Sequence, residues 1–163
     1  MVNFIIIVVS DSVYYGKKSD VSGELAIKIL KARGHKIFDK IIVPNSYREI
    51  YRAIIESLKK SPDAIIIIGG TGPSPRDITI DVVKELSWRE LPGFGELFRM
   101  LSYNEIGARG IISRAGMFLI QDVVVIVTPG SPSAVKLALE KIVVEIIDHV
   151  VSELRRFEGE HRI

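Results

Sequence analysis

The chain has 163 residues, of which 47% are hydrophobic and 26% charged, and its formal net charge is +2. This length and composition suit one globular domain, and the small charge gives no indication of nucleic-acid binding. No apolar run reaches the roughly 18 residues of a membrane span, and the N-terminus lacks the features of a secretory signal. There is no cysteine, and the three histidines are scattered without metal-ligand spacing. We therefore expect a cytoplasmic protein without disulfides.

We expect a single domain over residues 1–163, in which residues 155–163 form a frayed polar tail. No internal repeat, linker or low-complexity segment divides the chain. With 26 Ile, three Asn and one Gln, the sequence is poor in thermolabile side chains and rich in Lys, Glu and Arg. This bias is typical of proteins from hot habitats.

Predicted strands and helices alternate along the chain. Apolar runs rich in β-branched residues predict strands at 3–10, 36–43, 64–68 and 123–128, with 117–120 as a short excursion. Helical periodicity, caps and breakers predict helices at 21–33, between 46 and 62, at 80–87, up to about 104, and from 132 towards 154. We expect Leu97, Met100 and Leu101 to lie in the core. This alternation is typical of an α/β fold with a mostly parallel sheet covered on both faces.

The stretch 64–79 leads from a buried strand into a turn made almost entirely of Gly, Pro, Ser and Thr. Gly69, Gly70 and Gly72 have no Cβ, so the backbone there can adopt positive φ and bring its N–H groups close to an anion. Thr79 is placed to cap the next helix. The spacing excludes a P-loop and a dinucleotide fingerprint. By itself, such a turn is either a ligand site or an ordinary tight loop.

Two further turns carry helix-start signals. Ser46 and Glu49 have the spacing of a capping box. Ser131 is placed to cap the last helix, with Pro132 at its first position.

Polar turns also follow the other predicted strands. The segment 10–12, Ser-Asp-Ser, is either a local Asx turn or part of a ligand site at a strand end. Because parallel strands bring their carboxyl ends to one edge of the sheet, we expect the turns at 69–77, 92–95 and 129–133 to converge there. Asp11 and Asn45 would join them at one pocket.

Four segments taken together resemble the MoaB/MogA family of molybdopterin adenylyltransferases, which act in molybdenum cofactor biosynthesis. They are residues 69–79 (Gly-Gly-Thr-Gly-Pro-Ser-Pro-Arg-Asp-Ile-Thr), 91–96 (Leu-Pro-Gly-Phe-Gly-Glu), 113–114 (Ser-Arg) and 129–132 (Pro-Gly-Ser-Pro). The resemblance covers essentially the whole chain in order, and the first motif is specific.

The resemblance implies a three-layer α/β/α domain that binds molybdopterin and ATP at the strand ends. Members of the family transfer AMP to the terminal phosphate of molybdopterin and release pyrophosphate, with Mg²⁺ present. The product passes to a separate metal-insertion protein. Family members are homo-oligomers, usually trimers or hexamers built from trimers.

The resemblance also implies roles for particular residues. The catalytic residues would be Asp77, which also holds or orients Mg²⁺, and Asn45. The nucleotide and its phosphates would contact Gly69, Gly70, Thr71, Gly72, Pro92, Gly93, Phe94, Gly95 and Glu96. Molybdopterin would contact Ser10, Asp11, Ser12, Ser113, Arg114, Pro129, Gly130 and Ser131.

Asn45 departs from the family pattern, in which this loop has an Asp that is regarded as catalytic. Asn cannot supply the charge, although it can offer a carbonyl oxygen or an N–H donor. The attacking phosphate is already anionic near neutral pH, because its second pKa is about 6, so positioning and charge neutralisation matter more than a base. We expect an active enzyme in which Asn45→Asp gives a modest gain.

Two alternatives remain open from the sequence. The missing carboxylate at position 45 is compatible with a protein that only binds or carries molybdopterin. A nucleotide hydrolase of the competence-damage type typically has two adjacent acids in the 69–77 loop, and Arg76 before Asp77 disfavours it.

Overall fold

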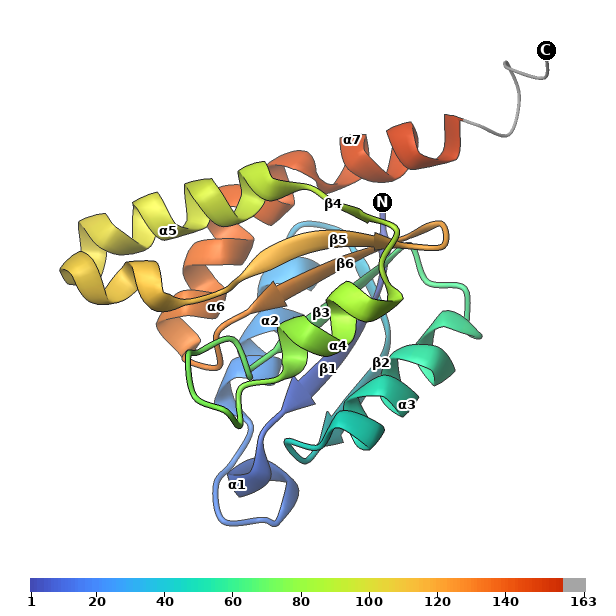
Figure 1. The fold of residues 1–163 in the computed structure, drawn as a ribbon. Coiled ribbons are helices and arrows are strands. Elements are labelled where there is room, and N and C mark those ends of the chain that lie inside the picture. Colours follow the sequence, from blue (N-terminus) through green and yellow to red (C-terminus); the bar gives the residue numbers. More distant parts are fainter. Residues whose placement is uncertain (157–163) are drawn as a thin grey trace.

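The computed structural model describes residues 1–156, and in them the chain forms a six-stranded sheet with helices on both faces (Figure 1). The strand order is β2-β1-β3-β6-β5-β4. The strands are β1 (Asn3–Val9), β2 (Lys36–Val43), β3 (Ala64–Ile68), β4 (Arg89–Glu90), β5 (Gly116–Ile120) and β6 (Val123–Thr128). The four strands β2, β1, β3 and β6 run parallel, whereas β5 is antiparallel to β6 and to β4. The predicted mostly parallel α/β fold is confirmed.

The helices complete three layers. They are α1 (Asp11–Tyr14), α2 (Val21–Ala32), α3 (Tyr47–Leu58), α4 (Thr79–Leu86), α5 (Pro92–Ile106), α6 (Pro132–Ala138) and α7 (Val144–Arg155). A 3-10 helix, η1 (Gly107–Ile112), follows α5, and a π-helical turn, η2 (Leu139–Val143), joins α6 to α7. The hydrophobic cluster on one face of the sheet includes α2, α5, α6 and α7, and the cluster on the other face includes α3 and α4.

The central strands are buried on both faces, as their unbroken apolar runs predict. Along β1, Phe4, Ile6 and Val8 belong to one hydrophobic cluster, and Ile5 and the alternate residues after it belong to the other. Every residue of β3 is buried between β1 and β6. This rigid centre fixes the positions at which the loops leave the sheet.

Several local predictions need correction. The run at 117–120 is not an excursion but a fully buried strand, β5, because it pairs along β6 and supports the edge strand β4. Ser46 precedes α3 but makes no capping hydrogen bond, so the capping box is not formed. Thr79 is the first residue of α4 and not its cap, which is Ile78.

The second group of corrections concerns α5. The predicted turn at 92–95 is the first turn of this helix, with Pro92 at its start. Leu97 and Met100 are exposed, and not in the core. Leu97 lies outside the face of α5 that buries Phe94 and Phe98. Met100 lies in the second half of α5, which extends past the edge of the sheet together with η1 (Figure 1).

At the C-terminus, Arg155 still belongs to α7 and Arg156 caps it, so the predicted tail does not begin at 155. The rest of that predicted tail lies outside the described residues. Among residues 1–156, no helix combines the length and the apolar character needed to cross a membrane.

His35 offers a test of this packing. Its ring is buried against Phe4, with ring centroids 5.4 Å apart, and Nδ1 accepts a hydrogen bond of 3.2 Å from the Val2 N–H. Burial lowers the pKa of His35, although Asp148 opposes the shift and the N-terminal ammonium reinforces it. A protonated ring could not accept the bond from Val2.

We therefore expect the free energy of unfolding to fall as the pH drops below about 6.5, the ordinary pKa of histidine. The unfolded chain takes up the proton at higher pH than the folded chain, so the stability present above that pH is lost on acidification. Denaturant titrations at pH 7.5 and 5.5 measure the change. His35→Asn keeps an acceptor near Nδ1 but does not titrate, and should lose most of the difference between the two pH values. An equal pH dependence in wild type and variant would contradict this role.

Candidate active site

Gly69 and Gly70 carry the chain out of β3 where the ends of three strands meet. Gly69 has φ +109° and donates from its N–H to the Thr128 carbonyl at 2.9 Å. A Cβ on Gly69 would collide with the Val9 carbonyl at the end of β1. Gly70, with φ +70°, has Thr79 Oγ1 where its own Cβ would lie. Only glycine fits this path.

The turn leaves its backbone donors free. Within residues 1–156, the N–H groups of Gly70, Thr71 and Gly72 donate no hydrogen bond to the protein. Successive unpaired N–H groups in a turn with positive φ form a concave site for anions. The predicted phosphate-binding turn therefore has the local structure that this role requires.

A first hollow of about 490 Å³ lies beside this turn, and we name it the serine hollow. The loops after β1, β3 and β6 and the start of α2 line it. Its polar lining is Ser10, Lys18, Ser19, Asp20, Ser22, Gly69, Gly70, Gly130 and Ser131. Ser22 Oγ donates to the Gly130 carbonyl at 2.6 Å, which ties α2 to the turn after β6. This hollow can hydrogen-bond a polar ligand from several sides.

A second hollow of about 300 Å³ lies on the other side of the same turn. We name it the arm hollow, because one wall is the arm formed by the second half of α5 and η1. The arm contributes Phe98, Ser102, Ile106, Arg109, Gly110 and Ile112, and the opposite walls include Gly70, Thr71, Gly72, Asp77, Ser113, Pro129, Gly130 and Ser131. The two hollows share Gly70, Gly130 and Ser131, so ligands in them would meet at that backbone.

Asp77 presents its carboxylate to the arm hollow from a closed turn. Its Oδ2 accepts a hydrogen bond of 3.1 Å from the Ser74 N–H, and its own N–H donates to the Ser74 carbonyl at 2.9 Å. A Cβ on Gly72 would lie 2.6 Å from that Oδ2. The absence of a side chain at Gly72 thus lets the carboxylate fold over the phosphate-binding turn.

Arg114 supports the Asp77 turn and does not line either hollow. Its guanidinium makes two hydrogen bonds to Asp81, of 2.9 and 3.0 Å, and a third to the Asp77 carbonyl. These bonds lower the pKa of the Asp81 carboxyl and raise the pKa of Arg114. The backbone N–H of Arg114 donates to the Thr71 carbonyl at 2.8 Å, and the hydroxyl of the neighbouring Ser113 lies 3.1 Å from Thr71 Oγ1.

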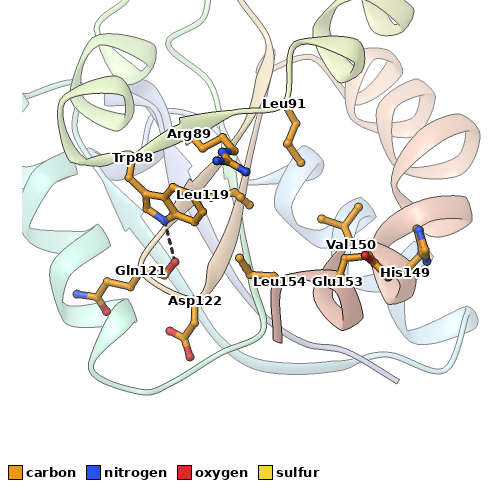
Figure 2. A pocket seen from close by; sticks show the side chains of 10 residues that line it. All are labelled: Trp88, Arg89, Leu91, Leu119, Gln121, Asp122, His149, Val150, Glu153 and Leu154. Carbon is orange, nitrogen blue, oxygen red and sulfur yellow. Dashed lines mark hydrogen bonds between the residues drawn. The ribbon is translucent and has the colours of Figure 1, made fainter. Parts of the chain in front are cut away.

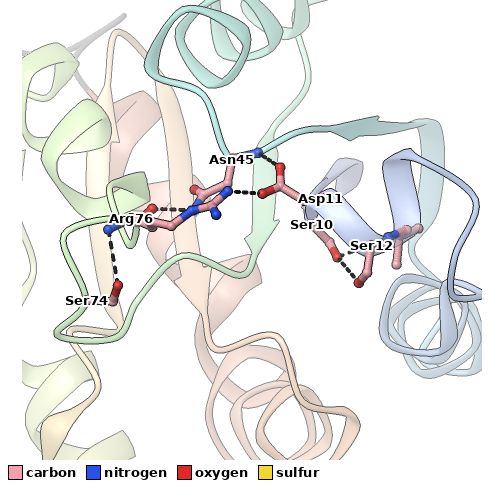
Figure 3. A network of polar contacts seen from close by, with 7 residues as sticks. Ser10, Asp11, Ser12, Asn45, Ser74 and Arg76 are labelled. Atoms are coloured by element: carbon pink, nitrogen blue, oxygen red, sulfur yellow. Dashed lines mark hydrogen bonds and ion pairs between the residues drawn. The ribbon is translucent and has the colours of Figure 1, made fainter.

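The loops after β1 and β2 contact each other through Asp11 and Asn45 (Figure 3). Asp11 Oδ1 accepts from the Asn45 N–H at 2.8 Å, and its other oxygen pairs with Arg76. Ser10 caps α1 by accepting from the Val13 N–H at 3.3 Å. Of these residues only Ser10 and Val13 line the serine hollow, and neither Asp11 nor Asn45 lines the serine hollow or the arm hollow.

The predicted convergence is therefore correct for the turns at 69–77 and 129–133 but not for 92–95. Pro92, Gly93, Phe94, Gly95 and Glu96 line neither hollow, because they form the first turn of α5. Phe94 is buried and stacks on Phe98, with ring centroids 6.3 Å apart. The arm residues of the second hollow carry no motif, so sequence reasoning missed them.

A larger hollow of about 770 Å³ lies at the opposite end of β6, beside the turn at Gln121 and Asp122 (Figure 2). Trp88 and α7 form its sides, and Trp88 Nε1 donates to the Gln121 carbonyl at 2.9 Å. None of the predicted site residues lines it. We therefore place the candidate active site at the serine hollow and the arm hollow, at the carboxyl ends of the strands.

Comparison with known proteins identifies the family of the chain. Residues 5–149 match the family described as "Probable molybdopterin binding domain". The chain belongs to this family. The resemblance to MoaB and MogA that the motifs carry is confirmed.

Two relatives and one solved structure show how close the match is. Molybdenum cofactor biosynthesis protein B of Bacillus subtilis is 43% identical over 141 residues, which cover 85% of this chain and 83% of that protein. The molybdopterin adenylyltransferase of Pyrococcus furiosus is 40% identical over 156 residues, covering 93% and 90%. The crystal structure of the tungsten cofactor synthesizing protein MoaB from Pyrococcus furiosus has a TM-score of 0.89 at 37% identity, covering 95% of this chain and 98% of that chain.

The requirement for glycine at position 70 can be tested by measuring the free energy of unfolding of variants. Gly70→Ala should lower the free energy of unfolding by about 2 kcal/mol or more, because a left-handed non-glycine residue costs about 1–2 kcal/mol and the collision with Thr79 adds to it. Gly93→Ala is the matched control, since nothing lies within 4 Å of its Cβ, and it should change stability by about 0.5 kcal/mol or less. Urea denaturation of both variants measures the difference. Equal losses would contradict this account of the turn.

Proposed function

We propose that this protein is a molybdopterin adenylyltransferase of molybdenum cofactor biosynthesis. It would transfer AMP from ATP to the terminal phosphate of molybdopterin and release pyrophosphate. The observation that carries the proposal is the pair of hollows joined at Gly70, Gly130 and Ser131, with Asp77 beside the junction. A two-substrate reaction needs two adjoining sites of this kind. The relative of that name in Pyrococcus furiosus supports the assignment.

We assign the arm hollow to ATP. The unpaired N–H groups of Gly70 to Gly72 can donate hydrogen bonds to its phosphate oxygens, and Arg109 supplies positive charge in the same hollow. Ile106 and Ile112 offer exposed apolar surface that suits an adenine ring. Residues 92–96, the first turn of α5, would support the arm that forms one wall of this hollow and would not contact the nucleotide.

We assign the serine hollow to molybdopterin. Its hydroxyl groups suit the donors and acceptors of a pterin, and Lys18 suits an anionic substituent. Gly130 and Ser131 lie in both linings, so the terminal phosphate of molybdopterin would reach the α-phosphate of ATP at this shared wall.

Asp77 fits a magnesium ion that is shared with the substrate. Among residues 1–156 no three His, Cys, Asp or Glu side chains gather into a metal-binding group. Mg²⁺ commonly needs only one or two carboxylates, with waters and substrate phosphates completing its octahedron. Asp77 would supply the protein's carboxylate, and the bound ion would neutralise charge on the phosphates.

The proposed reaction depends mainly on how the protein positions the two substrates relative to each other. An oxygen of the terminal phosphate of molybdopterin attacks the α-phosphorus of ATP, the bond between the α-phosphorus and its bridging oxygen breaks, and pyrophosphate leaves. That oxygen is anionic near neutral pH, so the protein needs no general base. The unpaired N–H groups of the 70–72 turn hold the phosphates, and the shared backbone wall sets the approach of the two substrates.

The proposal is tested by incubating the protein with molybdopterin, ATP and Mg²⁺ and detecting adenylylated molybdopterin. Asp77→Asn should fold normally but slow AMP transfer at least about tenfold, near 1.4 kcal/mol of barrier. Asp122→Asn, in the hollow at the other end of the sheet, makes the same change of charge and should retain the wild-type rate. Equal rates for Asp77→Asn and wild type would refute the role of Asp77. Tight molybdopterin binding by a wild type without transfer would support a carrier.

We also infer that the protein is a homo-oligomer, either a trimer or a hexamer built from two trimers, that hands its product to a metal-insertion protein. Outside the arm hollow, the second half of α5 exposes two large apolar side chains, Met100 at 57% and Tyr103 at 55%, which we call the stripe. Their spacing of three residues places them along one side of α5. Exposed apolar surface of this kind marks protein contacts.

Sedimentation at micromolar concentration should therefore show three or six copies of the 18.2 kDa chain. Met100→Glu places a charge in the stripe and should shift the protein towards the monomer, because an interface that buries an unpaired carboxylate is disfavoured. Lys141→Glu, an exposed change on the π-helical turn, is the control and should leave the mass unchanged. A wild type that sediments as a monomer would overturn the inference.

A further inference from the structure

Three loops at the carboxyl edge of the sheet are joined by a closed set of contacts around Asn45 (Figure 3). The Asn45 N–H donates to Asp11 Oδ1 at 2.8 Å, and the Asn45 side-chain Nδ2 donates to the Arg76 carbonyl. The Arg76 guanidinium pairs with the other oxygen of Asp11. The strand order β2-β1-β3 makes these loops neighbours, so the contacts join the loop before α3 to the turn that carries Asp77.

We propose that Asn45 is a positioning residue of this site, which fixes the peptide between Arg76 and Asp77 by donating a hydrogen bond from its side-chain amide. The Arg76 carbonyl belongs to the same peptide unit as the Asp77 N–H. That N–H closes the turn by donating to the Ser74 carbonyl at 2.9 Å, and Asp77 Oδ2 accepts from the Ser74 N–H. A hydrogen bond that fixes the Arg76 carbonyl therefore fixes the orientation from which the Asp77 carboxylate projects.

The surroundings of Asn45 require an amide. With Nδ2 towards the Arg76 carbonyl, Oδ1 is buried and has no hydrogen-bond partner among residues 1–156. An amide turned the other way would place two carbonyl oxygens against each other. The buried Oδ1 is also inaccessible to a metal ion or a phosphate, so Asn45 does not act as their ligand in this conformation.

An aspartate at the same position would be unfavourable in its ionised form. It would place a negative oxygen against the Arg76 carbonyl, bury the second oxygen without a partner, and lie next to the Asp11 carboxylate. Asp11 and Arg76 are the charged groups that contact this position. The modest gain expected for Asn45→Asp from the sequence is therefore replaced by a loss.

The Arg76–Asp11 ion pair cannot take over the positioning. The Arg76 side chain is 75% exposed and that of Asp11 is 36% exposed. Exposed ion pairs contribute little to stability, because water screens the charges and both side chains lose conformational freedom. Within the set of contacts among Asp11, Asn45 and Arg76, the side-chain amide of Asn45 is the one that reaches the backbone of the Asp77 turn.

The first test needs no substrate and does not depend on the proposed function. Hydrogen exchange measured by mass spectrometry reports protection of the peptide that covers residues 73–78. Asn45→Asp and Asn45→Ala should each lower protection at least about threefold at pH 7.5, and Asn104→Asp, the same change on the exposed side of α5, should not. At pH 5 a protonated carboxyl can donate to the Arg76 carbonyl, so Asn45→Asp should regain protection while Asn45→Ala does not. Unchanged protection in both Asn45 variants would overturn the proposal.

The second test rests on the proposed function. Single-turnover AMP transfer by Asn45→Asp, divided by the wild-type rate, should fall about tenfold at pH 8 and recover towards pH 6. A carboxylate that served as a metal ligand or charge would give the opposite trend, with the ratio rising as the pH rises, and that result would overturn the proposal. If the wild type transfers no AMP, the proposed function fails, and the exchange experiment still decides whether Asn45 positions the turn.

Discussion

The close approach of three strand ends at Gly69 is the constraint on which the site depends. There the chain leaves β3 with its N–H bonded to Thr128 at the end of β6, while the Val9 carbonyl of β1 occupies the space of a Cβ. The next residue, Gly70, is held with positive φ against Thr79. This crowding sends the chain over the edge of the sheet and leaves successive N–H groups unpaired. One hollow lies on each side of that path.

A turn rich in glycine needs support from its neighbours, and this turn receives it from two sides. Arg114 and Asp81 hold it from the side of α4 and β5, and Asn45 and Asp11 hold it from the loops after β1 and β2. Each contact is worth only about 0.5–1.5 kcal/mol, but several acting on one short segment limit its conformations before any ligand arrives. The glycines provide the close approach, and the hydrogen bonds from neighbouring loops provide the order that the proposed transfer would require.

Sequence reasoning was strongest where one physical rule decides the structure. The β-branched run at 64–68 predicted a strand buried on both faces, and the glycines after it predicted a turn with positive φ. Met100 was misplaced because the apolar pattern of α5 does not show where the helix leaves the sheet. The two-residue strand β4 is too short for any periodicity, and its existence depends on pairing with β5.

The contacts of single polar side chains were the least predictable part. Arg114 was expected at the ligand, but its partners Asp81 and Asp77 are more than 30 residues away in sequence, and only the fold brings them together. The same holds for Asn45 and Arg76. Motifs therefore predicted which loops lie together at this edge of the sheet, while the hydrogen-bond partners of single side chains came from the structure.

The central claim is that the turn from Gly70 to Gly72 receives the phosphates of ATP. The most direct measurement is a crystal structure with Mg²⁺ and α,β-methylene-ATP, in which the bond that breaks in AMP transfer is blocked. Our account predicts the phosphate chain on the N–H groups of this turn, the adenine against Ile106 and Ile112, and Mg²⁺ beside Asp77. A nucleotide seated in the hollow beside Trp88, or phosphates that leave these N–H groups unoccupied, would contradict it.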